Sequence, residues 1–235
     1  MSKIHIISSG TGVGKTLITS LLCKYFNDKK INYIATKPIV SGFKLANKNE
    51  DLYQIINAEN KKYSLANVKR HSAHLFKFPL SPDQAAEKEK VNYATVKTLS
   101  AFIKKHDKKY DKVLIEGVGG VCVPLNRSET YLDYLIKDFN KKNDKIILVL
   151  GSYLGSLSHS ITTLKTLENS RLNPAFIVVT QSLKKDCELY IDIAATIKSL
   201  SNFTSVNIIG LDNLTKRNEA KALKVFYERI SKENI

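Results

Sequence analysis

Residues 8 to 16 form the glycine-rich segment S-S-G-T-G-V-G-K-T, which strongly limits how this chain can fold. The segment follows the apolar stretch I-H-I-I and precedes L-I-T-S-L-L-C-K-Y-F, whose apolar residues have helical spacing. A strand, a glycine-rich turn and a helix beginning at Gly-Lys-Thr direct several backbone N–H groups and the positive end of the helix dipole at one anion. This order predicts a phosphate-binding loop in an α/β fold.

Individual residues of this loop have predicted roles in binding a nucleotide. Gly10, Gly12 and Gly14 supply backbone freedom. Lys15 is placed to reach the β- and γ-phosphates, and the Thr16 hydroxyl is placed to bind Mg²⁺. Ser9 occupies the first position of the motif, where glycine is usual. The alternative is a chance glycine turn that only caps the helix, and the flanking strand and helix patterns argue against it.

The rest of the chain alternates short apolar runs with segments of helical spacing. Uninterrupted apolar strands are typical of a parallel sheet that is buried on both faces. We therefore predict one α/β domain over residues 1–235, a doubly wound, mostly parallel sheet with helices on both faces. The predicted strands are Ile4–Ser8, Tyr33–Thr36, Val113–Glu116, Ile146–Leu150, Phe176–Thr180 and, more weakly, Asn207–Ile209. The predicted helices are Lys15–Phe26, Thr95–Lys105, Leu157–Glu168, Glu188–Leu200 and Lys216–Ser231. The segment Phe43–Val91 is polar and irregular, and we expect it to be an insertion that covers a site.

Polar residues at the ends of the second and third strands extend the predicted site. Glu116 ends an apolar strand and precedes G-V-G-G, so its carboxylate should face the ligand crevice of the sheet and hold Mg²⁺. The alternative is an acid in a tight turn. Lys37 and Ser41 follow the second strand and fall at the same edge. The alternative for Lys37 is a solvated surface group. Asp51 either caps a short helix or helps to bind the metal, and spacing alone does not decide between the two.

The formal net charge of +15 raises the question of nucleic-acid binding. The basic residues come as scattered doublets such as Lys61-Lys62 and Lys104-Lys105, whereas a nucleic-acid patch typically shows a run of about five to eight. We therefore predict a solvated, lysine-rich surface and no nucleic-acid partner.

No membrane segment or signal peptide is predicted. The longest strongly apolar run, Ile146–Leu150, is far shorter than the ~20 residues that cross a bilayer. The chain enters a predicted strand by Lys3, which leaves no room for a signal segment. We expect a cytoplasmic protein without a membrane partner.

Several motifs in this order resemble the dethiobiotin synthetase family, from residue 3 to about residue 180. They are the glycine-rich loop, T-K-P-I-V-S-G, N-E-D, F-P-L-S-P, L-I-E-G-V-G-G-V-C-V-P-L and I-L-V-L-G-S-Y-L-G-S-L-S-H. A first loop position other than glycine is tolerated in that family. The resemblance implies a homodimeric, P-loop NTPase-like ligase that uses ATP and Mg²⁺ to carboxylate 7,8-diaminopelargonate with CO₂ and close the ureido ring of dethiobiotin.

The resemblance also implies roles for residues of this chain. The implied catalytic residues are Lys15, Lys37 and Thr11. The implied nucleotide-binding residues are Gly12, Val13, Gly14, Lys15, Thr16, Leu17, Asp51, Glu116, Gly117, Val118, Gly119, Thr180 and Gln181. The implied substrate-binding residues are Thr11, Ser41, Gly155, Ser156, Leu157, Ser158 and Tyr190, the last from the partner subunit. The implied metal ligands are Thr16, Asp51 and Glu116.

Two of these assignments have alternatives. The segment Gly155–Ser158 either binds the substrate carboxylate with helix-start N–H groups or simply supplies a serine N-cap. Thr180 and Gln181 stand where the family often has an Asn-Asp-like pair against adenine, so weaker discrimination between bases is expected.

The alternative function is that of a partition or septum-positioning ATPase, a nucleotide switch that binds DNA or membrane. That class carries a lysine five places before the lysine of Gly-Lys-Thr, where this chain has Gly10. The segment 216–235 also mixes acids among its bases, unlike a basic membrane-binding helix.

Overall fold

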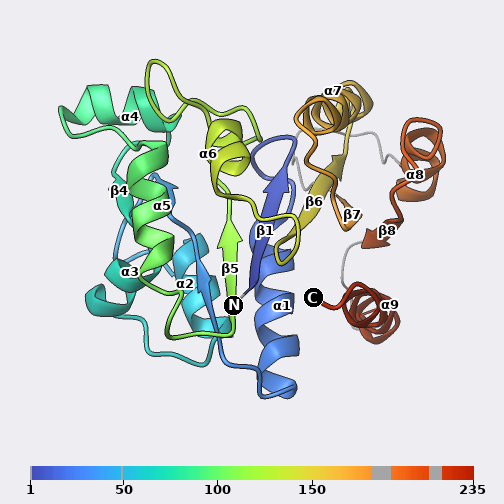
Figure 1. The fold of residues 1–235 in the computed structure, drawn as a ribbon, viewed down its shortest axis with the longest axis horizontal. Coiled ribbons are helices and arrows are strands. Elements are labelled where there is room, and N and C mark those ends of the chain that lie inside the picture. Colours follow the sequence, from blue (N-terminus) through green and yellow to red (C-terminus); the bar gives the residue numbers. More distant parts are fainter. Residues whose placement is uncertain (1, 49, 182–191, 212–218) are drawn as a thin grey trace.

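Strands and helices alternate along the computed structural model, which describes residues 2–48, 50–181, 192–211 and 219–235 (Figure 1). The strands are β1 (Ser2–Ser8), β2 (Tyr33–Thr36), β3 (Ile39–Ser41), β4 (His74–Phe76), β5 (Lys112–Glu116), β6 (Lys145–Ser152), β7 (Phe176–Gln181) and β8 (Ile208–Leu211). The helices are α1 (Lys15–Asp28), α2 (Asp51–Ala58), α3 (Leu65–His71), α4 (Pro82–Glu89), α5 (Val96–Lys104), α6 (Tyr131–Asp138), α7 (Ser156–Asn169), α8 (Ile193–Leu200) and α9 (Glu219–Lys232).

Six of the strands form one sheet in the order β2-β5-β1-β6-β7-β8, and all its described pairs are parallel. After β1 the chain fills one side of the sheet with β2 and β5 and then crosses to the other side for β6, β7 and β8. The strand order therefore reverses at β1, and ligands of such sheets bind beyond the carboxyl ends of the strands at that reversal. The glycine-rich loop after β1 lies at this point.

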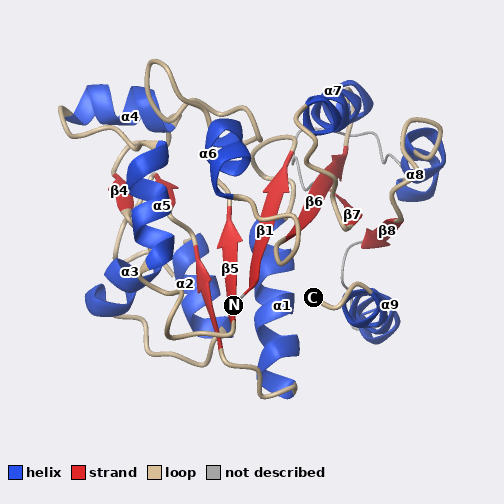
Figure 2. Ribbon diagram, viewed as in Figure 1, coloured by secondary structure: helices blue, strands red, loops and turns tan. Residues whose placement is uncertain are grey.

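The sheet has a hydrophobic core on each face, because neighbouring residues of a strand point to opposite sides. In β6, Ile146 and Leu148 pack in one core, whereas Ile147 and Val149 pack in the other. Helices α5 to α8 contribute to the first core, and α1 and α9 contribute to the second. Figure 2 shows these helices on both sides of the sheet. The predicted doubly wound α/β class is confirmed.

The segment Phe43–Val91 is more regular than its composition predicts. It contains α2, α3, β4 and α4, and β4 pairs in parallel with β3 to form a second, two-stranded sheet. Its apolar residues are few but are grouped into a small third core with Leu52, Ile56 and Val68. The expectation of an irregular segment was therefore wrong, since short helices need only a few buried residues each.

Two predicted helices fall partly outside the described residues. The described part of the predicted helix Glu188–Leu200 is α8, which begins at Ile193 after an Asp192 cap. The predicted helix Lys216–Ser231 corresponds to α9, whose Phe226 and Ile230 are fully buried.

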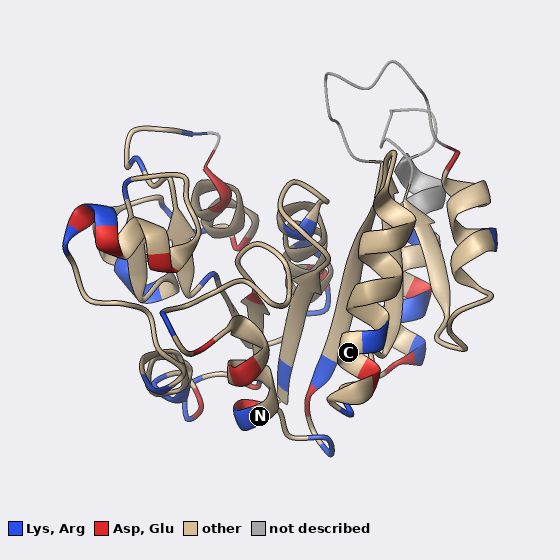
Figure 3. Cartoon of the chain, turned by 90° about the horizontal axis from the view of Figure 1, so that it is seen from above, with Lys and Arg blue, Asp and Glu red and all other residues tan. Residues whose placement is uncertain are grey.

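None of the described helices is long and apolar enough to span a membrane. In Figure 3, acidic residues are interspersed among the basic ones on several helices.

Candidate active site

A cavity of about 820 Å³ lies at the carboxyl ends of β1 and β5. The loop after β1, the segments around β3, the start of α2, the approach to α4 and the loop after β5 all contribute to its wall. The lining residues are Gly10, Thr11, Gly12, Gly14, Lys15, Thr16, Lys37, Ser41, Asp51, Pro79, Leu80, Ser81, Pro82, Gln84, Glu116, Val118, Gly119, Gly120 and Val123.

The backbone of the glycine-rich loop leaves the start of α1 open to a ligand. Gly14 is the N-cap of α1 with φ +95°, a left-handed conformation that glycine adopts without strain, and no side chain caps the helix. The first N–H groups of α1 therefore have no side-chain acceptor, as expected for an anion site. Gly120 approaches the loop so closely that an added Cβ would lie 2.9 Å from the Ser9 carbonyl oxygen.

Lys15 folds back onto the backbone around the cavity. Its ammonium group donates to Ser8 Oγ at 2.8 Å and to the carbonyl oxygens of Gly10 and Gly119 at 3.0 and 2.8 Å. Burial, together with the nearby positive charge of Lys37, lowers the pKa of Lys15 to about 8, although Glu116 and Asp51 oppose the shift. To contact a phosphate, the ammonium group must exchange these three neutral oxygens for charged ones.

This lowered pKa predicts that nucleotide affinity falls at alkaline pH. The charged form of Lys15 prevails below pH 8 and is lost as the pH rises through that value, so the Kd for ATP should increase about tenfold between pH 7 and pH 9. Calorimetric titration in buffers of different ionisation enthalpy should also show proton uptake on binding above pH 8. A Kd that stays constant from pH 7 to pH 9 would show that Lys15 keeps its proton in the free protein.

The buried Lys37 forms ion pairs with two carboxylates, the fully buried Glu116 and the partly exposed Asp51. Its ammonium group contacts Asp51 Oδ2 and lies 2.8 Å from Glu116 Oε1, and its backbone N–H donates to the His71 carbonyl oxygen. Burial alone would lower the pKa of Lys37, but Glu116 and Asp51 outweigh it and raise the pKa to about 12. Lys37 is therefore positively charged at neutral pH and is held in place at both its backbone and its side chain.

Glu116 is completely buried and accepts hydrogen bonds from the start of α1. Thr16 Oγ1 donates to Glu116 Oε1 at 2.8 Å, and Thr19 Oγ1 donates to Oε2 at 2.7 Å. The carboxylate is thus fixed between the phosphate-binding helix and Lys37. Thr19 was not among the predicted site residues, although its position one turn after Lys15 could have indicated it.

Asp51 is the first residue of α2, and it lines the cavity. The N-cap position belongs to Glu50, and no side chain makes a capping hydrogen bond there. Burial would raise the pKa of Asp51, but the charge and hydrogen bond of Lys37 and a hydrogen bond from Thr16 outweigh it and lower the pKa. Of the two readings of Asp51, the structure favours a place in the site over a capping role.

Asp51 and Glu116 both contact the Lys37 ammonium group, and the Thr16 hydroxyl donates a hydrogen bond to Glu116. Hydroxyl and carboxylate oxygens are the hard ligands that Mg²⁺ takes, usually with phosphate oxygens and waters completing the coordination. A cationic group already bridges both carboxylates in this structure, which shows that the position accepts positive charge. The residues present therefore fit a Mg²⁺ ion bound together with a nucleotide.

Two predicted substrate-binding hydroxyls line the same cavity. Thr11 is exposed at the top of the loop, and Ser41 Oγ is buried without a hydrogen-bond partner among the described residues. Sequence reasoning assigned no role to the opposite wall, formed by Pro79, Leu80, Ser81, Pro82 and Gln84. The F-P-L-S-P motif was the available signal for this wall.

Other predicted site residues lie away from the cavity wall. Gly117 and Leu17 do not line it, and Val13 is buried beneath the loop. The segment 155–158 opens α7 beyond the end of β6 and does not line the cavity either. Gly155 is the N-cap of α7, and Ser156 Oγ accepts from the Tyr153 N–H, so no serine side chain caps the helix start. Tyr190 lies outside the described residues.

Thr180 supports the glycine-rich loop from below. Its hydroxyl donates to the Val13 carbonyl oxygen at 2.6 Å, and its side chain lies 3.2 Å from where a Cβ on Gly14 would stand. The neighbouring Gln181 has a buried Oε1 without a partner among the described residues. The contact of Thr180 and Gln181 with a base stays a prediction.

Replacing Thr180 by valine tests whether its hydroxyl only stabilises the glycine-rich loop or also helps to select the nucleotide base. Valine keeps the shape and loses the hydroxyl, so we expect the Kd for ATP and for GTP to rise by the same factor, roughly 3- to 10-fold, because one buried hydrogen bond contributes about 1 kcal/mol. Equilibrium binding of both nucleotides to the wild type and the variant measures this. A change in the ratio of the two Kd values would instead give the hydroxyl a role in base selection.

Comparison with known proteins places this site in a family. A family model described as an AAA domain matches residues 2–216. The ATP-dependent dethiobiotin synthetase of Phenylobacterium zucineum is 32% identical over 202 residues, which cover 84% of this chain and 82% of the relative. That of Caldicellulosiruptor saccharolyticus is 30% identical over 216 residues, covering 89% and 84%. The chain belongs to the dethiobiotin synthetase family. Membership makes it an ATP-dependent ligase.

Solved structures show the same fold at low sequence identity. The cell division ATPase MinD of Pyrococcus furiosus superimposes with a TM-score of 0.56 at 16% identity, covering 99% of both chains. The hydrogenase maturation factor HypB of Archaeoglobus fulgidus gives 0.54 at 13% identity, covering 99% of this chain and 89% of that one. These similarities establish the P-loop NTPase architecture of this dethiobiotin synthetase family member.

Proposed function

We propose that this chain makes dethiobiotin from 7,8-diaminopelargonate, CO₂ and ATP. The observation that carries the proposal is the pair of buried lysines, Lys15 and Lys37, which line one cavity together with Glu116 at the end of β1. Two cations at one phosphate-binding loop suit the transfer of a γ-phosphoryl group to an anionic nucleophile. The negative charges of the nucleophile and of the triphosphate repel each other unless the protein supplies positive charge.

The proposed reaction has three steps. One amine of the substrate attacks the carbon of CO₂ and loses a proton, giving a carbamate. A carbamate oxygen attacks the γ-phosphorus of ATP, ADP leaves, and a carbamic-phosphoric anhydride forms. The second amine then attacks the carbamate carbon, loses a proton, and expels inorganic phosphate as the five-membered urea ring closes.

The residues of the cavity have distinct roles in this proposal. Lys15 leaves its carbonyl partners to contact the β- and γ-phosphates, while Lys37 faces the transferring phosphoryl group from the opposite side. Thr11 and Ser41 orient the carbamate or the amine by hydrogen bonds. Ser41 is suited to this because its buried hydroxyl has no partner among the described residues.

Thr16, Asp51 and Glu116 would hold Mg²⁺ in this proposal, and the ion would neutralise charge on the β- and γ-phosphates. Thr19 keeps Glu116 oriented through its hydrogen bond to Oε2. Use of ATP and a bicarbonate-derived substrate is consistent with the expected cytoplasmic location.

The substrate carboxylate is proposed to bind at the start of α7, outside the phosphate cavity. The Ser156 N–H donates to the Tyr153 carbonyl oxygen, but the N–H groups of Leu157 and Ser158 follow a left-handed Gly155 and have no capping side chain, so they are available to an anion. In the proposed homodimer, Tyr190 of the second copy would complete this end of the site. Sedimentation that shows an active monomer at assay concentration would exclude the shared site.

The septum-positioning alternative shares the fold but lacks support from residues. Position 10 is glycine where that class has its lysine. The apolar residues Phe226 and Ile230 of α9 are buried in a core of the protein, so they are not available to a membrane surface.

A product assay tests the proposed function. Protein, 7,8-diaminopelargonate, ATP, Mg²⁺ and ¹³C-bicarbonate should give a cyclic urea whose carbonyl carries the label, with one ADP released for each ring. ATP hydrolysis that depends on DNA or lipid, without labelled urea, would favour the nucleotide switch instead.

A further inference from the structure

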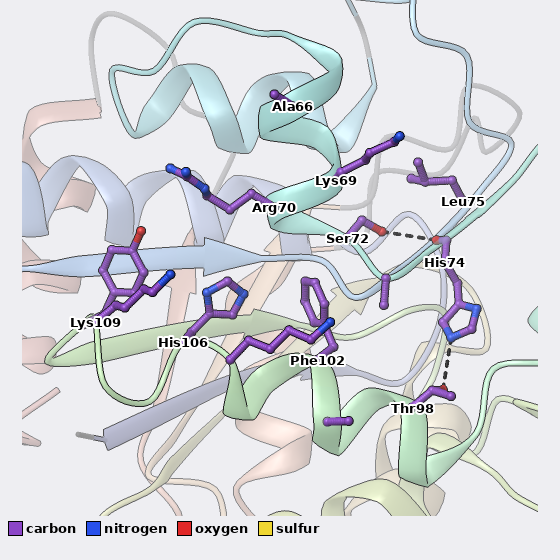
Figure 4. Close-up of a pocket in the computed structure, with 14 residues that line it drawn as sticks. Ala66, Lys69, Arg70, Ser72, His74, Leu75, Thr98, Phe102, His106 and Lys109 are labelled. Atoms are coloured by element: carbon purple, nitrogen blue, oxygen red, sulfur yellow. Dashed lines mark hydrogen bonds between the residues drawn. The ribbon is translucent and has the colours of Figure 1, made fainter.

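A second cavity of about 970 Å³ lies between α3 and α5, apart from the candidate active site. Its wall includes Lys69 and Arg70 of α3, and Lys105 and Lys109 after α5, but no acidic residue. In Figure 4, Lys69 and Arg70 extend from one wall and Lys109 from the other, with His106 and Phe102 between them. Basic residues that look scattered along the sequence are therefore gathered around one groove, which we call the α3–α5 groove.

The four basic residues of this groove lack ion-pair partners within the described chain. No carboxylate lies within ion-pair distance of Lys69, Arg70, Lys105 or Lys109 among the residues described. Glu59, the nearby buried acid, is already engaged by His71, Lys61 and the Ala35 N–H. The groove thus presents positive charge that no described acid neutralises.

His106 is a buried polar group in the wall of the groove. His106 is only 7% exposed, and its buried Nε2 has no hydrogen-bond partner among the described residues. Phe102 and Tyr110 pack against the imidazole with ring centroids 5.3 and 6.0 Å away. A buried imidazole without a partner is costly unless a ligand or water satisfies it. The groove therefore offers a hydrogen-bonding group to a ligand as well as charge.

We propose that the α3–α5 groove binds a small organic phosphate. Its volume is in the range of small-molecule sites, roughly 300 to 1,000 Å³. The planar guanidinium group of Arg70 and the lysines match phosphate oxygens, and the rings of Phe102 and Tyr110 provide an apolar surface for the organic part.

The charge around His106 makes this binding dependent on pH. The pKa of His106 is lowered to about 4, chiefly by burial and also by His71, Lys109 and Arg70, while Glu59 opposes them. Arg70 and His71 belong to α3, and Glu59 lies at the end of α2. Lys109 and Tyr110 follow His106 in the segment after α5. A bound phosphate anion would raise the pKa of His106 toward its ordinary value, so the imidazole should titrate at a higher pH in the complex than in the free protein.

The floor of the groove is hydrogen-bonded to the backbone beside Lys37. Ser72 Oγ and the His74 N–H both donate to the Pro38 carbonyl oxygen, at 3.2 and 2.9 Å. A ligand that draws α3 and α5 together therefore acts on a segment that fixes Lys37. Phosphate binding in the α3–α5 groove is independent of the reaction proposed for the active site.

Titration with phenyl phosphate, followed by NMR of the histidine side chains, tests the proposal. The His106 signals, assigned with His106→Gln, should shift saturably, whereas those of the exposed His159 should not. Lys105→Ala/Lys109→Ala should weaken binding about tenfold or more, since two charge-assisted contacts are lost. The matched pair Lys104→Ala/Lys108→Ala removes the same charge from exposed neighbours outside the groove and should change the Kd less than about twofold.

Three outcomes would overturn the proposal. The first is no shift of the His106 signals at about 10 mM phenyl phosphate, near the weakest binding that such a site should show. The second is an equal loss of affinity in both double variants, which would indicate a diffuse surface charge. The third is a shift caused only by a single-stranded oligonucleotide, which would make the groove a nucleic-acid surface.

Discussion

Replacing Lys37 by glutamine is expected to lower kcat about 100-fold or more and to leave the Kd for ATP within about threefold of the wild type. The reason is that the charge of Lys37 matters most when negative charge builds up on the transferring phosphoryl group. Glutamine can still donate a hydrogen bond to Glu116, so the buried carboxylate keeps a partner. Single-turnover kinetics with saturating ATP separates the chemical step from binding.

The control for this variant is Lys44→Ala, which removes an exposed lysine from the loop after β3. Thermal unfolding of both variants shows whether any loss of rate comes from loss of structure. A kcat for Lys37→Gln within about threefold of the wild type would remove Lys37 from the catalytic residues.

Replacing Glu116 by glutamine is expected to affect both catalysis and stability. The buried carboxylate accepts from Lys37, Thr16 and Thr19 at once, and an amide has one oxygen in place of two. We expect kcat/KM to fall at least 100-fold and half-saturation with Mg²⁺ to require about tenfold more metal, since a hard anionic ligand is lost.

The same variant should unfold about 3 kcal/mol more easily, because the buried Lys37 loses the charge of the fully buried Glu116 and keeps only the partly exposed Asp51 as an ion-pair partner. Denaturant unfolding measures this change, and Glu87→Gln, which removes an exposed acid paired with Arg127, serves as the control. An unchanged Mg²⁺ titration for Glu116→Gln, with the expected loss of stability, would limit Glu116 to a structural role.

The strands and the phosphate-binding loop could be predicted because their signals are local. Uninterrupted apolar runs such as Ile146–Leu150 indicate a strand buried on both faces, and β6 contains that run. Lys15, Lys37 and Glu116 could be grouped from sequence, because each follows or ends a strand of one parallel sheet. Parallel strands bring such ends to a common edge.

The parts that were missed depend on contacts between distant segments. The wall formed by residues 79–84 reaches the cavity only because β4 pairs with β3, and three-residue strands leave almost no pattern in a sequence. The α3–α5 groove has the same origin, since Lys69 and Lys105 line one groove only when α3 lies opposite α5. Asp51 could not be assigned from spacing, because an acid at the start of a helix fits a cap and a metal ligand equally well.

Transfer of oxygen from bicarbonate to phosphate tests the central claim most directly. If a carbamate oxygen attacks the γ-phosphorus in this cavity, ¹⁸O-bicarbonate used before it exchanges with water should leave one labelled oxygen in the inorganic phosphate and one in the urea carbonyl. Mass spectrometry of both products from a single turnover measures this. Phosphate without label, formed together with a labelled urea, would contradict phosphoryl transfer to the carbamate.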